Sequence, residues 1–237
     1  MSKLIEYNDG DTLLEGYLAL PKSVSERTPT VIVVHDWSGK NEFACQKADK
    51  LAEGGYIGFA LDMYGKGKIG RTNEEKTALM QPLASNRAAL QQRIIAALNA
   101  VKSIPEVDPD KIAAIGFCFG GLCVLDLARA GADIKGVISF HGLLGAPDNL
   151  SSPEIKASIL VLHGYDDPMV KPEAVMQFAH EMTKAGASWQ IDMYGNTMHA
   201  FTNPQANDPD FGTVYNKKSD ERSWMAMCNF LDEVLSK

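Results

Sequence analysis

The chain has 237 residues, 45% of them hydrophobic and 22% charged, and a formal net charge of −7 at pH 7. These values are typical of an ordered globular protein and argue against a disordered chain. The acidic balance, with no basic run, disfavours nucleic acid and anionic membrane as partners. No linker interrupts the sequence, so we expect a single domain over residues 1–237.

The cellular compartment is predicted from three features: the amino-terminal segment, the length of the apolar stretches and the spacing of the cysteines. The first ten residues hold no apolar core and no small-residue cleavage site, and no stretch approaches 18 consecutive apolar residues. The cysteines lack paired C-x-x-C spacing, which is typical of free thiols in a reducing compartment. They are Cys45, Cys118, Cys123 and Cys228. We therefore expect a cytoplasmic protein with no membrane span.

Apolar periodicity predicts strands and helices that alternate along the chain. In chain order we expect strands at 13–20 and 30–34, a helix at 42–53, a strand at 56–61, a helix at 83–103, a strand at 112–117 and a helix at 119–129. Strands at 136–140 and 158–162, a helix at 172–185, a strand at 189–194 and a helix at 221–236 complete the order, with loops at 63–72 and 203–219. This order predicts an α/β fold with a mostly parallel central sheet covered by helices on both faces. Ligands of such folds bind at the carboxyl ends of the strands.

One of these strand ends has the form of a nucleophile elbow. The segment Gly116-Phe117-Cys118-Phe119-Gly120-Gly121 joins an apolar strand to a helix. In an elbow the glycines let strand and helix pass closely while the central side chain is held in the open. The helix amino terminus favours a thiolate, because its free N–H groups attract negative charge. Cys118 is therefore a candidate nucleophile.

A thiol nucleophile needs a base, and the base needs an orienting acid. In elbow-type hydrolases these partners follow in the order nucleophile, acid, histidine. Here that order is Cys118, Asp167 and His199, each expected in a loop after a strand. We prefer Asp167 to Asp166 as the acid because Pro168 biases the backbone of Asp167 towards an extended form, whereas Asp166 suits a turn cap.

The other histidines have simpler interpretations. His180 lies within a predicted helix and is expected on the surface. His141 and His163 each end a strand, where a local hydrogen bond that fixes the turn is expected. For the developing oxyanion we expect two backbone N–H donors: that of Phe119, which follows the nucleophile, and that of Trp37, in the loop after the first central strand.

With these residues in view, the chain resembles the dienelactone hydrolase family of the α/β-hydrolase superfamily over nearly its whole length. The matching segments are Val33-Val34-His35-Asp36, Leu61-Asp62-Met63-Tyr64-Gly65, 115–121, 163–168 and Met198-His199-Ala200-Phe201. The resemblance implies a Cys118–Asp167–His199 triad, with oxyanion donors at Trp37 and Phe119.

The resemblance also implies residues around the triad. An acidic residue of the family contacts the resting thiol, and Asp36 stands at its position. An arginine that holds the substrate carboxylate in the family is replaced here by Asn203. Arg71, Lys76 and Arg87 are candidates for a second cation in the region that follows Asp62. These replacements argue against dienelactone itself as the physiological substrate.

The sequence therefore predicts a cofactor-free hydrolase of a small ester or lactone that works through a thioester acyl-enzyme. One alternative is a small-molecule receptor on the same scaffold, and another is a thioesterase or acyltransferase that uses the same triad. No His, Cys or carboxylate set has metal-ligand spacing, so no metal is expected.

Overall fold

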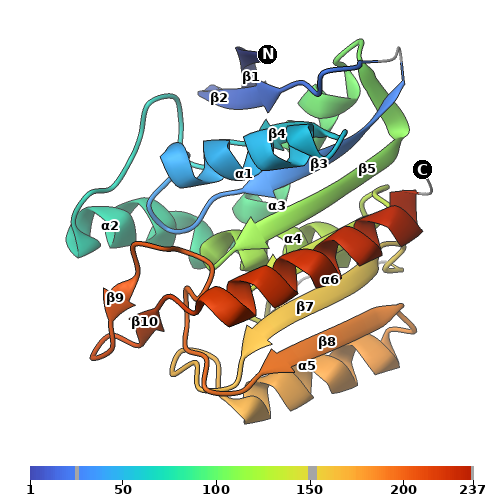
Figure 1. Ribbon diagram of the computed structural model, residues 1–237. Helices are drawn as coiled ribbons and strands as arrows, with labels where there is room; N and C mark the ends of the chain where they lie inside the picture. Colours follow the sequence, from blue (N-terminus) through green and yellow to red (C-terminus); the bar gives the residue numbers. More distant parts are fainter. Residues whose placement is uncertain (25–26, 149–153, 236–237) are drawn as a thin grey trace.

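The computed structural model describes residues 1–24, 27–148 and 154–235. Within these ranges eight strands form one sheet in the order β1-β2-β4-β3-β5-β6-β7-β8 (Figure 1). Their bounds are β1 (Ser2–Asp9), β2 (Thr12–Ala19), β3 (Thr28–Val34), β4 (Ile57–Ala60), β5 (Val107–Phe117), β6 (Gly136–Phe140), β7 (Ser158–Gly164) and β8 (Trp189–Tyr194). The six strands from β4 to β8 in this order run parallel, and β1 and β2 are antiparallel additions at one edge. The expected α/β fold with a mostly parallel sheet is confirmed.

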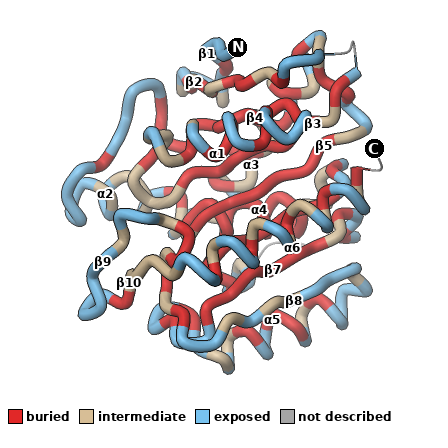
Figure 2. The backbone as a smooth tube through the Cα atoms, in the orientation of Figure 1, coloured by how far each residue is buried: buried red, intermediate tan, exposed pale blue. Residues whose placement is uncertain are grey.

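Helices cover both faces of this sheet, because its central strands are apolar on both sides. On one face lie α1 (Glu42–Glu53) and α6 (Lys217–Leu235). On the other lie α3 (Arg87–Lys102), α4 (Phe119–Arg129) and α5 (Pro172–Lys184). The central strands are buried along most of their length (Figure 2).

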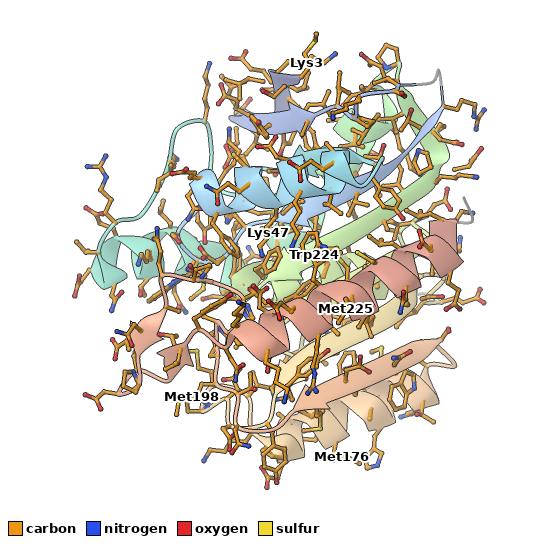
Figure 3. All side chains as sticks on the ribbon, in the orientation of Figure 1. Lys3, Lys47, Met176, Met198, Trp224 and Met225 are labelled. Carbon is orange, nitrogen blue, oxygen red and sulfur yellow. The ribbon has the colours of Figure 1, made fainter. Side chains whose placement is uncertain are left out.

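A lysine joins the two helices of the first face. The Nζ atom of Lys47, on α1, lies 5.2 Å from the ring centre of Trp224, on α6 (Figure 3). It also lies 3.8 Å from a carboxylate oxygen of Asp220, at the start of α6. Because the side chain is largely buried, the nearby carboxylate and the aromatic face offset part of the cost of removing its charge from water.

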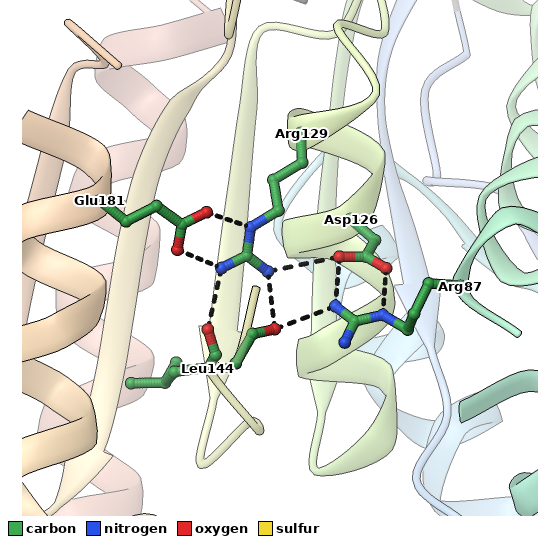
Figure 4. Close-up of polar contacts among 6 residues, drawn as sticks. Arg87, Asp126, Arg129, Leu144 and Glu181 are labelled. Carbon is green, nitrogen blue, oxygen red and sulfur yellow. Dashed lines mark hydrogen bonds and ion pairs between the residues drawn. The ribbon is translucent and has the colours of Figure 1, made fainter. Parts of the chain in front are cut away.

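Ion pairs join the helices of the other face (Figure 4). The carboxylate of Asp126, on α4, accepts two hydrogen bonds from Arg87, on α3, and one from Arg129, on α4. Arg129 also binds both carboxylate oxygens of Glu181, on α5, at 2.7 and 2.8 Å. A further bond of 2.8 Å runs from Arg129 to the carbonyl oxygen of Leu144, in the segment after β6. The network therefore links three helices to that segment.

The element boundaries differ from the sequence prediction in the segment between β4 and β5. In place of one helix at 83–103 there are two, α2 (Asn73–Ala84) and α3, separated by Ser85 and Asn86. The side chain of Asn86 accepts the N–H of Ala89 and so begins α3. Thr72 and Glu75 form a reciprocal capping box that begins α2 directly after the predicted loop at 63–72, in a stretch where no element is predicted.

Smaller differences occur elsewhere. β1 is not predicted, β5 begins five residues earlier than expected and α6 begins at Lys217. Two short strands, β9 (Asn207–Asp208) and β10 (Thr213–Val214), pair within the predicted loop at 203–219. This hairpin and α2 lie at the carboxyl edge of the parallel strands (Figure 1). They therefore flank the edge where a ligand is expected.

Within the described part of the chain, no helix combines the length and apolar character needed to cross a membrane.

Candidate active site

Cys118 occupies a single-residue turn between β5 and α4. Its backbone has φ 54° and ψ −114°, a conformation that L-residues rarely adopt. The N–H of Cys118 donates to the carbonyl oxygen of Phe140, at the end of neighbouring β6, over 3.0 Å. The half-buried thiol is thus held at the carboxyl edge of the sheet and at the amino terminus of a helix.

Two glycines make this turn possible. A Cβ atom on Gly116 would lie 2.0 Å from the carbonyl oxygen of Gly120, and one on Gly120 would lie 2.3 Å from the carbonyl oxygen of Val34. Any side chain at either position would push α4 away from β5 or β3. The close passage of strand and helix that the glycine pattern predicts is therefore present.

The structure brings Asp167 and His199 together. The Nδ1–H of His199 donates to Oδ2 of Asp167 over 2.7 Å, and both side chains are buried. The other oxygen of Asp167 accepts the backbone N–H of Met169 at 2.8 Å, which fixes the carboxylate. Asp166 instead accepts the backbone N–H of Thr197 at 3.0 Å, so it joins the two loops.

His199 and Cys118 line the same cavity. The Nε2 atom of His199 is shielded from solvent and has no hydrogen-bond partner among the described residues. Burial alone lowers the pKa of His199, but the charge of the Cys118 thiolate and the hydrogen bond to Asp167 outweigh it and raise the pKa to about 10. His199 is therefore an imidazolium at neutral pH when the thiolate stands beside it.

Phe119 and Trp37 carry the two backbone N–H groups that the sequence predicts as oxyanion donors. Phe119 is the first residue of α4, and Trp37, which lines the cavity, follows β3 by three residues. Neither N–H takes part in a hydrogen bond within the described ranges. The carbonyl oxygen of Trp37 accepts the hydroxyl of Tyr64 at 3.1 Å, and the Tyr64 ring stacks on Phe119 with centroids 5.9 Å apart. Tyr64 thus links the two segments that carry these donors.

Asp36 lines the cavity, but its carboxylate is turned towards Ser38. One carboxylate oxygen accepts both the backbone N–H of Ser38, at 2.8 Å, and its hydroxyl. No hydrogen bond joins Asp36 to Cys118 in the described part of the chain. The observed contacts therefore tie Asp36 to its own loop.

The cavity has a volume of about 510 Å³ and lies between the elbow, α2 and the β9–β10 hairpin. Apolar side chains make up much of its lining, among them Phe43, Met80, Phe117, Leu143 and Met169. A space of this size is typical of a small-molecule site.

Of the expected substrate-binding residues, the structure places Asn203 at the cavity and Arg71 away from it. Asn203 is half-buried in the lining, and its side-chain oxygen accepts the N–H of Gln205 at 3.0 Å. Arg71 is exposed and is absent from the lining. Lys76, on α2, is in the lining instead, with Nζ 5.2 Å from the ring centre of Trp37. The guanidinium of Arg87 forms an ion pair with the carboxylate of Asp126, and Arg87 is absent from the lining.

Several lining residues have no counterpart in the sequence-based site. Met80 comes from α2, whose signal in the sequence is the spacing of Thr72 and Glu75. Phe211 comes from the β9–β10 turn, and its ring stacks on Trp37 with centroids 5.8 Å apart. His141 also lines the cavity, although its position at a strand end predicts only a local hydrogen bond.

Over the described ranges, no group of three or more His, Cys, Asp or Glu side chains is arranged to hold a metal ion.

A mostly parallel eight-stranded sheet with a cysteine elbow after β5 defines the chain as an α/β hydrolase in fold. Within that class it belongs to the dienelactone hydrolase family, which residues 14–235 match. The resemblance drawn from its motifs is thereby confirmed.

Individual proteins are also similar to this chain. The structure is similar to that of a dienelactone hydrolase-like promiscuous phosphotriesterase from metagenomic libraries, with 35% identity, a TM-score of 0.92, and 99% of this chain and 98% of that chain covered. An uncharacterized protein of Caenorhabditis elegans is 42% identical over 153 residues, which are 62% of this chain and 95% of that protein. A Bradyrhizobium protein named "Probable 2-oxo-3-(5-oxofuran-2-ylidene)propanoate lactonase" is 29% identical over 195 residues, 78% of this chain and 77% of that one.

Proposed function

We propose that this chain is a cofactor-free hydrolase of small esters or lactones that uses Cys118 as its nucleophile, His199 as its base and Asp167 as the orienting acid. The observation that carries the proposal is the 2.7 Å hydrogen bond from His199 to buried Asp167, since His199 and the elbow thiol line the same cavity. Membership of the dienelactone hydrolase family supports the same reaction class.

The first half of the reaction forms an acyl-enzyme. The Cys118 thiolate attacks the carbonyl carbon, and the carbonyl electrons move to oxygen. The N–H groups of Trp37 and Phe119 stabilise that oxyanion. When the tetrahedral intermediate collapses, the C–O bond to the leaving group breaks, and the leaving oxygen takes the proton from Nε2 of His199. A thioester on Cys118 and an alcohol result.

The second half releases the acid. Neutral His199 takes a proton from water as the water attacks the thioester carbonyl, and the same two N–H groups hold the second oxyanion. The C–S bond then breaks and restores the thiolate beside the imidazolium. Asp167 keeps His199 in the tautomer with its proton on Nδ1 throughout, because the carboxylate accepts from that atom.

Asp36 and Asn203 complete the proposed site. The bonds from Ser38 to Asp36 support a role for this carboxylate in fixing the loop that presents the Trp37 N–H, in place of a direct contact with the thiol. Asn203 offers an amide at the cavity wall, which suits a neutral polar group of the substrate.

Lys76 is the residue that we propose contacts an anionic substrate, and Arg71 has no such role. No ion pair involves Lys76 within the described ranges, and its side chain lines the cavity. We expect Lys76→Gln to raise the KM of a carboxylated aryl ester about tenfold or more and to leave the KM of the uncharged ester nearly unchanged. Arg71→Gln is the matched control and should change neither value. Steady-state kinetics with the two esters test this, and equal KM values for Lys76→Gln and wild type would contradict it.

The reaction itself is tested with a short-chain activated aryl ester. We expect wild type to hydrolyse it, and both Cys118→Ala and His199→Ala to lower kcat/KM by about two orders of magnitude or more. Equal rates in all three proteins would refute the proposed triad and favour a small-molecule receptor on this scaffold. A thioesterase or acyltransferase would instead show itself by faster turnover of a thioester or by transfer to an added alcohol.

A phosphotriester is a second candidate substrate. It is favoured by the similar structure, 35% identical in sequence, which is that of a promiscuous phosphotriesterase. In that reaction the same thiolate attacks phosphorus, the P–O bond to the aryl group breaks, and the departing oxygen takes the proton from His199, while the same N–H groups bind the phosphoryl oxygen. An aryl phosphotriester assayed with the same variants tests this second activity.

A further inference from the structure

His141 lies directly beside the proposed catalytic base. Its ring centre is 5.1 Å from that of His199, and the two rings cross at 64°. The side chain is buried, at 2% exposure, and it lines the cavity. No role in the reaction described above uses it.

The position of this ring is fixed from several directions. A hydrogen bond of 2.8 Å joins His141 Nε2 to the hydroxyl of buried Thr202. The ring also meets Phe201 edge to face, with centroids 5.1 Å apart. The backbone N–H donates to Leu162, on β7, at 2.9 Å. These contacts hold His141 at φ 39°, in the left-handed region that side-chain-bearing residues rarely enter.

Such a conformation is unfavourable by itself and persists only where surrounding contacts impose it. Asparagine or glycine would occupy a left-handed position with less strain. Histidine is among the side chains found there more often than most, so the backbone alone assigns it no role, and its surroundings decide. The ring of His141 lies against His199, and its backbone follows Phe140, whose carbonyl oxygen accepts the N–H of Cys118.

The chemistry of the ring suits that neighbour. Burial first, and then the nearby charges of His199 and Lys47, lower the pKa of His141 well below its usual value. A neutral imidazole can pack against an imidazolium without charge repulsion, and pairs of aromatic rings favour a crossed arrangement such as this one. His141 therefore does not compete with His199 for the proton.

We propose that His141 is a positioning residue, whose ring, anchored by Thr202, holds His199 in the orientation that serves Cys118. This inference rests on the proposed hydrolase function. Because a displacement of about 1 Å in a catalytic group can cost about a hundredfold in rate, loss of the ring should lower kcat with little change in KM.

The test compares two replacements of His141 in aryl ester hydrolysis. His141→Asn suits the left-handed backbone but removes the ring, and we expect kcat to fall about 10- to 100-fold, with KM changed by less than about threefold. His141→Phe keeps a ring of similar shape and should lower kcat by no more than about fivefold. His180→Gln, at an exposed position on α5, is the histidine control and should match wild type. Thermal unfolding of each protein establishes that it is folded.

Wild-type kcat in a folded His141→Asn protein would overturn the inference, as would an equal fall in His141→Phe and His141→Asn. If His141→Asn does not fold, Thr202→Val decides. Thr202→Val keeps the side-chain volume at this position and removes the hydroxyl that binds His141. We expect kcat to fall threefold or more, and an unchanged kcat would overturn the inference. A wild-type protein that hydrolyses no ester would instead refute the proposed function, which separates the two failures.

Discussion

At the scale of single residues, the site depends on a buried histidine that carries a charge. Desolvation disfavours the imidazolium of His199, yet its pKa is raised to about 10 because the Cys118 thiolate and the Asp167 carboxylate flank it. In the proposed reaction, the proton that the leaving group needs is therefore present on His199 at neutral pH. It is lost as the pH rises through about 10.

This pKa predicts the effect of Asp167→Asn. The carboxylate raises the pKa of His199, so its removal should move the alkaline fall of kcat/KM to lower pH. At neutral pH we expect a loss of about a hundredfold or more, because an amide does not enforce the required tautomer. Asp166→Asn, which alters the neighbouring carboxylate bound to Thr197, should leave the alkaline fall in place. A pH–rate profile decides, and an unmoved alkaline fall in Asp167→Asn would contradict the assignment.

At the scale of elements, the helices behind the site are joined through one buried carboxylate. Asp126 is fully buried between Arg87 and Arg129, whose remaining bonds reach Glu181 and the segment after β6 (Figure 4). Leu143, in that segment, lines the cavity. The network therefore couples helix packing to one wall of the site.

We expect Asp126→Asn to lower the free energy of unfolding by about 3–5 kcal/mol, because it removes the negative charge that faces buried Arg129 and half-buried Arg87. Asp133→Asn breaks a contact with Lys102 at the surface and should have little effect, since exposed ion pairs contribute little. Urea unfolding of the two variants measures the difference. Equal stabilities would show that the network contributes nothing beyond a surface pair.

Parts of the site could be predicted from sequence because they depend on local signals. The elbow at Cys118 and the strand-end positions of Asp167 and His199 follow from glycine spacing and apolar runs. The contacts of His141 with His199 and of Phe211 with Trp37 could not be predicted, since they join segments far apart in the chain. The capping box at Thr72 and Glu75 is a sequence signal for the start of α2. The apolar residues of α2 show only weak helical periodicity, so a prediction based on periodicity misses this helix.

At the scale of the whole molecule, the site exists because β3, β5 and α4 approach one another closely. Gly120→Ala would place a Cβ atom 2.3 Å from the carbonyl oxygen of Val34 and 2.6 Å from that of His35. The backbone carrying Trp37 and that carrying Cys118 would have to separate. We therefore expect this variant to lose its fold or nearly all of its activity. Gly195→Ala, where no atom lies within 4 Å of the added Cβ, should retain both. Circular dichroism and ester hydrolysis test this, and an active Gly120→Ala protein would contradict it.

The central claim is that Cys118 carries the acyl group during turnover. The most direct measurement is mass spectrometry of the wild-type protein, acid-quenched during hydrolysis of an activated ester and digested to peptides. We predict an acyl mass increment on the peptide that contains Cys118, and none after the same treatment of Cys118→Ala. An increment on another residue, together with full activity in Cys118→Ala, would contradict the account.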